Sequence, residues 1–198
     1  MTGLIEKTFS EQLNSSEGAF DLLSKFQNVK TREAIKKLLN EKYDDVLRRY
    51  QFELSEMQDL FESGKGAPPI SKNMPPKAGA IAWARSIMGR IKAPIQKFKN
   101  KSDQLMTKTF KTVAFKYVKL AKELDKGYEQ VIFDRWKDEN TGKAITLLKM
   151  PILNRKLEKD NIIYSVNFAA ELKVIIREAK FLDRIGKAIP QTIINIAL

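Results

Sequence analysis

Apolar side chains recur at steps of three and four residues along two long stretches of the chain, 31–61 and 102–136. This spacing puts them on one side of an α-helix, so each stretch predicts a long amphipathic helix. In the first stretch Thr31 is the expected N-cap, and Gly64 and Gly66 are expected to end the helix. Its apolar positions are Ile35, Leu39, Tyr43, Val46, Tyr50, Leu54, Met57 and Phe61.

The second long helix is predicted to begin after Ser102, whose hydroxyl can cap it, and to reach Trp136. Its expected inward positions are Leu105, Phe110, Val113, Tyr117, Ala121, Leu124, Tyr128 and Ile132. Around Gly142 the pattern weakens, and it does not decide whether residues 144–149 are helical.

The stretch between these helices contains four of the seven prolines within residues 68–76, which predicts an extended connector. Pro76 then suits the first turn of a shorter, basic helix. Gly79 and the alanines around it let a neighbouring backbone approach closely, and Trp83 is expected to be buried between the two long helices. Pro94 is expected to bend or divide this helix.

Residues 151–168 have a different pattern, with β-prone segments at 152–153 and 162–166 around a turn-like 158–161. A small hairpin is predicted. Two strands alone are marginal in water, so we expect Val166, Phe168 and Tyr164 to face helices. A last helix is predicted over 169–185, ended by Gly186, with Pro190 starting the next element.

The predicted fold class is all-α: an elongated helical bundle with two long helices, a short proline-flanked basic helix and a small β-hairpin. Residues 1–15 are interpreted as a poorly ordered lead-in. Ser15 or Ser16 is expected to cap a short helix through Phe26. Residues 16–198 are interpreted as a single helical segment that continues into a larger chain.

Residues 75–86 read PPKAGAIAWARS, and this run resembles the N-terminal tail region of dynein heavy chains, most of all the axonemal, outer-arm type. Further pieces follow in the family's order at Phe26–Ile35, Tyr128–Glu129, Trp136, Ser165–Phe168 and Ala188–Pro190. One departure is Ala169–Ala170, where the family usually has Asp-Pro. The residues that carry the motif are Pro75, Pro76, Gly79, Trp83, Arg85, Trp136, Val166, Asn167, Phe168 and Pro190.

The resemblance implies a non-catalytic tail segment that acts as a helical scaffold in the axoneme of a cilium. The implied partners are other heavy chains, intermediate and light chains, and docking proteins on doublet microtubules. The family's ATPase lies in a motor region that these residues do not include, and no cofactor is implied. Arg85 and Arg90 are possible interaction residues beside Trp83, since tryptophan and arginine are enriched at contact hot spots.

The composition gives a formal net charge of +12, with no histidine and no cysteine. The common general bases, nucleophiles and zinc ligands are therefore missing, and an enzyme is disfavoured. A basic balance also fits an alternative function, a free-standing helical adaptor on microtubules or another anionic surface. The lysines of the second long helix are interpreted as a solvated face: Lys108, Lys111, Lys116, Lys119 and Lys122.

The last ten residues, 189–198, read IPQTIINIAL and are apolar to the last residue. Large exposed apolar patches are rare on soluble monomers, so we expect further tail helices or a partner to cover this segment. Ile193 and Ile194 are the expected contact residues. Neither a signal peptide nor a membrane span is predicted.

Overall fold

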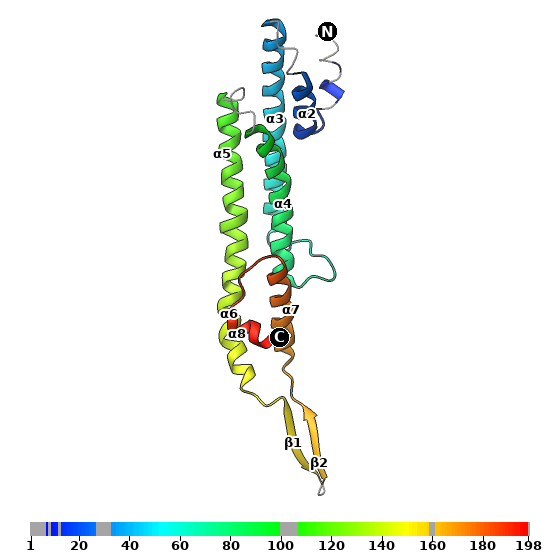
Figure 1. Cartoon of the computed structure of the whole chain (residues 1–198), viewed down its shortest axis with the longest axis vertical. Helices are drawn as coiled ribbons and strands as arrows, with labels where there is room; N and C mark the ends of the chain where they lie inside the picture. The colour runs from blue at the N-terminus through cyan, green and yellow to red at the C-terminus, as the bar shows by residue number, and fades with distance from the viewer. Residues whose placement is uncertain are drawn as a thin grey trace. The chain divides into compact units, whose positions relative to one another are not determined.

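A computed structural model describes residues 7, 9–11, 13–26, 33–99, 107–158 and 161–197, apart from the side chains of 33–36 and 196–197. The structure is mainly α-helical with one two-stranded sheet, which confirms the predicted class (Figure 1). The elements are α2 (Ser16–Lys25), α3 (Glu33–Gly64), α4 (Pro76–Lys99), α5 (Lys108–Lys122), the π-helix η3 (Glu123–Glu129), α6 (Gln130–Leu148), β1 (Leu153–Glu158), β2 (Asn161–Val166), α7 (Ala170–Arg184) and α8 (Gln191–Ala197).

The chain divides into two compact units, where we had expected a single segment from residue 16 onward. The first unit consists of residues 1–66 and 85–124, and the second of residues 67–84 and 125–198. Of the lead-in, the structure describes residues 7, 9–11 and 13–15, in which Phe9 is buried and the Lys42 ammonium lies 5.2 Å from the centre of its ring.

In the first unit, two side chains satisfy the N-terminal backbone donors of α2. Ser15 is the N-cap, as predicted, and its hydroxyl accepts from the N–H of Gly18. The carboxylate of Glu53 on α3 accepts from the backbone N–H of Ser16 at 2.9 Å and from its hydroxyl at 2.6 Å. A glutamate from one helix therefore fixes the start of another.

The core of the first unit centres on Tyr50, whose hydroxyl donates to the carbonyl of Ile91 at 2.6 Å. Burial raises the pKa of this phenol well above its usual value. The ring of Phe98 lies against both Tyr50 and Phe20, with ring centres 5.3 and 4.9 Å apart. Hydrogen bonds to Asp21 and Glu17 raise the pKa of Lys97, which joins α2 to α4 at the edge of this core.

Pro94 lies inside α4 and does not divide it, so that part of the prediction is wrong. A proline in a helix leaves the carbonyl four residues earlier without its usual donor. Here that carbonyl belongs to Arg90, an exposed residue, so water can take the place of the missing N–H.

The second long helix has a described N-cap at Thr107, whose hydroxyl accepts from the N–H of Phe110. The predicted cap, Ser102, lies outside the described residues. The π-helix η3 adds a residue to the helical repeat. Beyond it Phe133 is buried, and the predicted inward residue Ile132 is half-buried and packs against the same core. The helix passes Gly142 and continues to Leu148, which settles the open question about residues 144–148.

The second unit has its own core, to which α6, α7, α8 and the first turns of α4 contribute. Its buried members are Ala78, Ile81, Phe133, Trp136, Ala144, Ile175, Ala179, Leu182 and Ile193. Gly186 ends α7, as predicted, with a φ of 79°. The N–H of Lys187 donates to the carbonyl of Leu182 and that of Gly186 to Asp183, the two bonds of a Schellman motif.

This helix end places Lys187 against a buried acidic partner. The Lys187 ammonium lies 2.8 Å from the carboxylate of Glu129, with side chains only 11% and 10% exposed. The ammonium also lies 5.3 Å from the centre of the Phe133 ring. The end of α7 is thus tied to the junction of η3 and α6.

Lys187→Met should lower the free energy of unfolding by about 3 kcal/mol, because it leaves the Glu129 carboxylate buried without its cation. Adding Glu129→Gln should restore part of the loss, since the buried negative charge is then removed. Urea unfolding followed by circular dichroism measures both. Equal stability of the single and double variants would contradict the pairing.

Candidate interaction surface

The hairpin has two chemically different faces. Strands β1 and β2 are antiparallel, with Leu153 opposite Val166 and Leu157 opposite Ile162. Residues opposite each other share a side of the sheet, and neighbours along a strand alternate. The apolar face therefore consists of Leu153, Arg155, Leu157, Ile162, Tyr164 and Val166. The other face is mostly polar, with Asn154, Lys156, Glu158, Asn161, Ile163 and Ser165.

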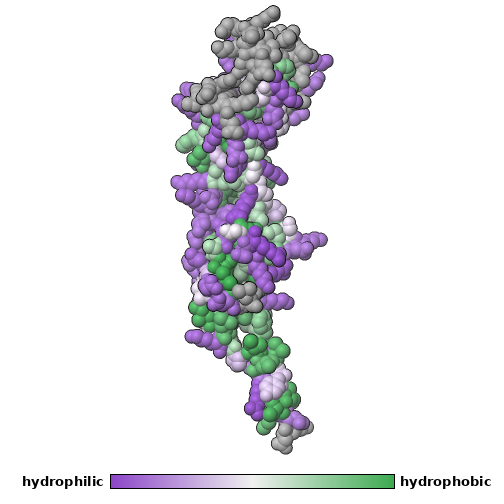
Figure 2. Space-filling model, in the orientation of Figure 1, coloured by the Kyte–Doolittle hydropathy of each residue, from purple (hydrophilic) through white to green (hydrophobic). Residues whose placement is uncertain are grey.

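The apolar face is exposed. Its five large apolar side chains are between 45% (Ile162) and 76% (Val166) exposed, and apolar side chains cover this region in Figure 2. The hairpin itself agrees with the prediction, but the packing predicted for it is wrong. Val166, Tyr164 and Phe168 do not face helices, since they are 76%, 61% and 46% exposed. Helices α6 and α7 also leave large apolar side chains exposed, among them Leu148 and Val174.

The base of the hairpin is closed by Asn167, one of the motif residues. Its backbone N–H donates to the carbonyl of Ile152 at 2.7 Å. Its side-chain amide donates to the carbonyl of Pro151 at 3.0 Å. Asn167 thus links the residue that follows β2 to the residues that precede β1, just before α7 begins. The hairpin extends away from the helices of its unit (Figure 1).

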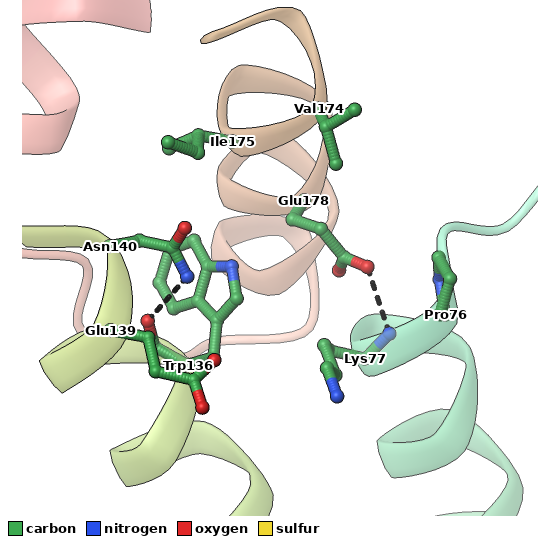
Figure 3. A pocket seen from close by; sticks show the side chains of 8 residues that line it. All are labelled: Pro76, Lys77, Trp136, Glu139, Asn140, Val174, Ile175 and Glu178. Atoms are coloured by element: carbon green, nitrogen blue, oxygen red, sulfur yellow. Dashed lines mark hydrogen bonds between the residues drawn. The ribbon is translucent and has the colours of Figure 1, made fainter. Parts of the chain in front are cut away.

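The other end of this unit is organised by the start of α4. The first backbone N–H groups of a helix have no partner within it. Pro75 and Pro76 have no N–H, so the donors of Lys77 and Ala78 remain. The carboxylate of Glu178 on α7 accepts from both, at 2.8 and 3.1 Å, and is 3% exposed (Figure 3).

Gly79 completes this junction, because a Cβ at this position would overlap the side chain of Ile70 in the connector. A close approach at Gly79 was expected from a neighbouring backbone, but the group that lies against it is the side chain of Ile70. Pro75 and Gly79 are both buried, while Pro76 is exposed.

A small open pocket of about 190 Å³ lies beside this junction (Figure 3). It is lined by Pro76, Lys77, Trp136, Glu139, Asn140, Val174, Ile175 and Glu178. Its most buried carboxylate, Glu178, is occupied by the backbone of α4, and the Asn140 amide donates to the carbonyl of Trp136. The pocket is mostly apolar, and its central polar groups hold the fold together.

Among the described residues no cluster of acidic side chains could hold a metal ion. No helix in the same ranges is long and apolar enough to cross a membrane.

The two tryptophans of the motif are core residues. Trp83 is 9% exposed, and its ring meets that of Tyr128 edge-on with centres 6.1 Å apart. Trp136 is 3% exposed and stacks on Phe133. Of the two arginines suggested for contacts, Arg85 is half-buried and Arg90 is exposed.

The terminal segment differs from its prediction. The carbonyl of Pro190 accepts from Ile193 and Ile194, so proline does start α8. Ile193, however, is fully buried in the core of its own unit and is not an exposed contact residue. Ile194 is half-buried. The Gly186 turn folds α8 back onto α6 and α7, and this covers Ile193.

Sequence reasoning missed Glu178, Glu129 and Lys187. Each is a charged residue in an amphipathic helix or next to one, where the pattern indicates solvent. The one signal for an acceptor such as Glu178 was the pair Pro75–Pro76. A helix that starts at these prolines has no side-chain cap, so its first free backbone N–H groups need an acceptor from another element.

Glu178→Gln should lower the free energy of unfolding by about 1–3 kcal/mol, because the amide NH₂ group cannot accept from the second of the two N–H donors. Glu139→Gln, an exposed neighbour on α6, is the matched control and should have little effect. Thermal unfolding compares the two variants. Equal effects would show that Glu178 does not cap α4.

Residues 1–198 match the family described as dynein heavy chain, N-terminal region 1. The chain is 35% identical over 184 residues to the dynein gamma chain of the flagellar outer arm of Chlamydomonas reinhardtii, covering 93% of this chain. It is 36% identical over 197 residues to the dynein-1-alpha heavy chain of the flagellar inner arm I1 complex of the same organism, covering 98%. Human dynein axonemal heavy chain 10 is 30% identical over 148 residues, covering 70%.

The chain spans only 4% of the length of each Chlamydomonas relative and 3% of the human one. The matched region nevertheless includes the whole sequence, with the two prolines, Gly79 and Glu178 that build the α4 junction. This chain therefore belongs to the family of dynein heavy chain N-terminal regions.

Proposed function

We propose that this chain is a non-catalytic tail segment of an axonemal dynein heavy chain, a helical scaffold in the cytoskeleton of the cilium. Its proposed partners are other heavy chains, intermediate and light chains, and the docking proteins that hold the motor on doublet microtubules. The family match over the whole chain supports the tail assignment. The axonemal setting is supported by the relatives, which are flagellar or axonemal heavy chains.

A structural role is supported by how the acidic groups are used. Glu178 and Glu53 each hold the start of a neighbouring helix, and Glu129 neutralises Lys187. General acid–base catalysis needs a group that is free to exchange a proton with a substrate. These three carboxylates are instead committed to backbone donors, a hydroxyl or an ammonium group within the fold.

The observation that carries the scaffold proposal is the exposed apolar face of the hairpin. Soluble proteins rarely leave contiguous large apolar side chains in water unless another molecule covers them. Here Leu157, Tyr164 and Val166 are each more than 60% exposed on the same face. We propose that a protein of the tail assembly covers this face.

Changing Leu157 and Ile162 together to serine should weaken assembly of the heavy chain with its partner subunits. The two lie opposite each other, so the double change removes one apolar cross-strand pair from the exposed face. The variants belong in the complete heavy chain, with partner content measured after density-gradient sedimentation of axonemal extracts. We expect the altered heavy chain to lose associated subunits while its ATPase activity is kept.

The matched control is Lys156→Ser with Ile163→Ser, an opposing pair on the other face of the same hairpin. It perturbs the hairpin to a similar extent but leaves the apolar face intact. Normal subunit content in both variants, or an equal loss in both, would refute the contact through the apolar face.

A further inference from the structure

The outward side of α5 combines lysines with large apolar residues. Successive residues of an α-helix are about 100° apart, so steps of three and four residues return to one side. We call this narrow row the outer stripe of α5. It consists of Lys108, Lys111, Phe115, Val118, Lys119 and Lys122.

The inward side of α5 lies opposite and is already used. Phe110, Val113 and Leu120 are buried in the first unit, where α5 packs on α3. The outer stripe is therefore no part of that core. Its Phe115 is 72% exposed and its Val118 57% exposed.

Among the residues that the structure describes, the lysines of the outer stripe have no ion-pair partner. All four are exposed, and α5 contains neither aspartate nor glutamate. Within the described ranges no ion pair involves any of them, although other lysines such as Lys97 and Lys187 are paired. A merely solvated helix face needs no phenylalanine and is usually mixed in charge.

We propose that the outer stripe of α5 docks an acidic amphipathic helix of a partner protein. The apolar residues of that helix cover Phe115 and Val118, and its carboxylates flank them to meet the lysines on either side. Charge complementarity selects the partner and sets its register, while the apolar contact supplies affinity. The surface lies on a different element from the hairpin, so its test is independent of the proposed function.

The same features argue against other anionic partners. A helix that binds a membrane surface inserts a wide apolar face, whereas the wide apolar face of α5 is turned into the protein. Single-stranded nucleic acid uses several aromatic platforms along a basic groove. Phe115 is the only aromatic residue of the outer stripe, and Val118 offers a base no stacking surface.

The test uses the full 198-residue chain and a synthetic helical peptide as the probe, with leucines along one stripe and glutamates beside it, matched to the 15 residues of α5. Binding is followed by fluorescence anisotropy at several salt concentrations. Lys111→Glu with Lys122→Glu should weaken binding about tenfold, because two attractions become repulsions. Phe115→Ser with Val118→Ser should weaken it about fivefold and leave the salt dependence unchanged.

The charge control is Lys173→Glu with Lys180→Glu, two exposed lysines of α7, which changes the net charge equally. It should leave binding within about twofold of the parent chain. Equal loss in both charge variants would overturn the proposal, because net charge alone would then explain binding. It would also be overturned if duplex DNA, or vesicles containing phosphatidylserine, bound more tightly than the peptide and lost binding with the same α5 variants.

Discussion

The second unit depends on one carboxylate placed at the start of one helix. Inside a protein, an unpaired backbone N–H costs about 1–3 kcal/mol. Pro75 and Pro76 remove two such donors, and Glu178 accepts from the two that remain. Because Glu178 lies on α7, this interaction fixes α7 against the start of α4. The Lys187–Glu129 pair then holds the other end of α7 at η3 and α6. The first unit uses the same device, since Glu53 holds the start of α2.

The sequence alone predicted helix boundaries correctly where a residue determines the local backbone conformation or caps the helix it adjoins. Ser15, Pro76 and Gly186 do so, and each marks a helix boundary that the structure confirms. The features that the sequence analysis missed depend on residues far away in the sequence or on an irregular helical turn. Glu178 acts on donors about a hundred positions away, at a separation of 101 for Lys77. The π-helix η3 interrupts the regular 3.6-residue period, so the pattern did not single out Phe133, which is buried next to the half-buried Ile132.

Two predictions about apolar side chains were wrong, in opposite directions. Val166 in the hairpin was predicted to pack against helices, but it is exposed. Ile193 near the end of the chain was predicted to be an exposed contact residue, but it is buried. Ile193 is covered because α8 folds back at Gly186 onto α6 and α7. The hairpin instead extends away from these helices, although α6 and α7 have exposed apolar side chains such as Leu148 and Val174.

The lysines of the chain fall into two groups, those that form ion pairs within a unit and those that are exposed on α5. Lys97 and Lys187 are paired with carboxylates within their units and contribute to the fold. Within the described part of the chain, the lysines of the outer stripe of α5 form no ion pair, and they flank Phe115 and Val118, which are exposed. Internal packing therefore accounts for neither this stripe nor the apolar face of the hairpin. Side chains that the fold leaves exposed remain available to other molecules, and these two surfaces differ in chemistry. The hairpin offers mainly apolar contact, while α5 adds charge that can discriminate between partners.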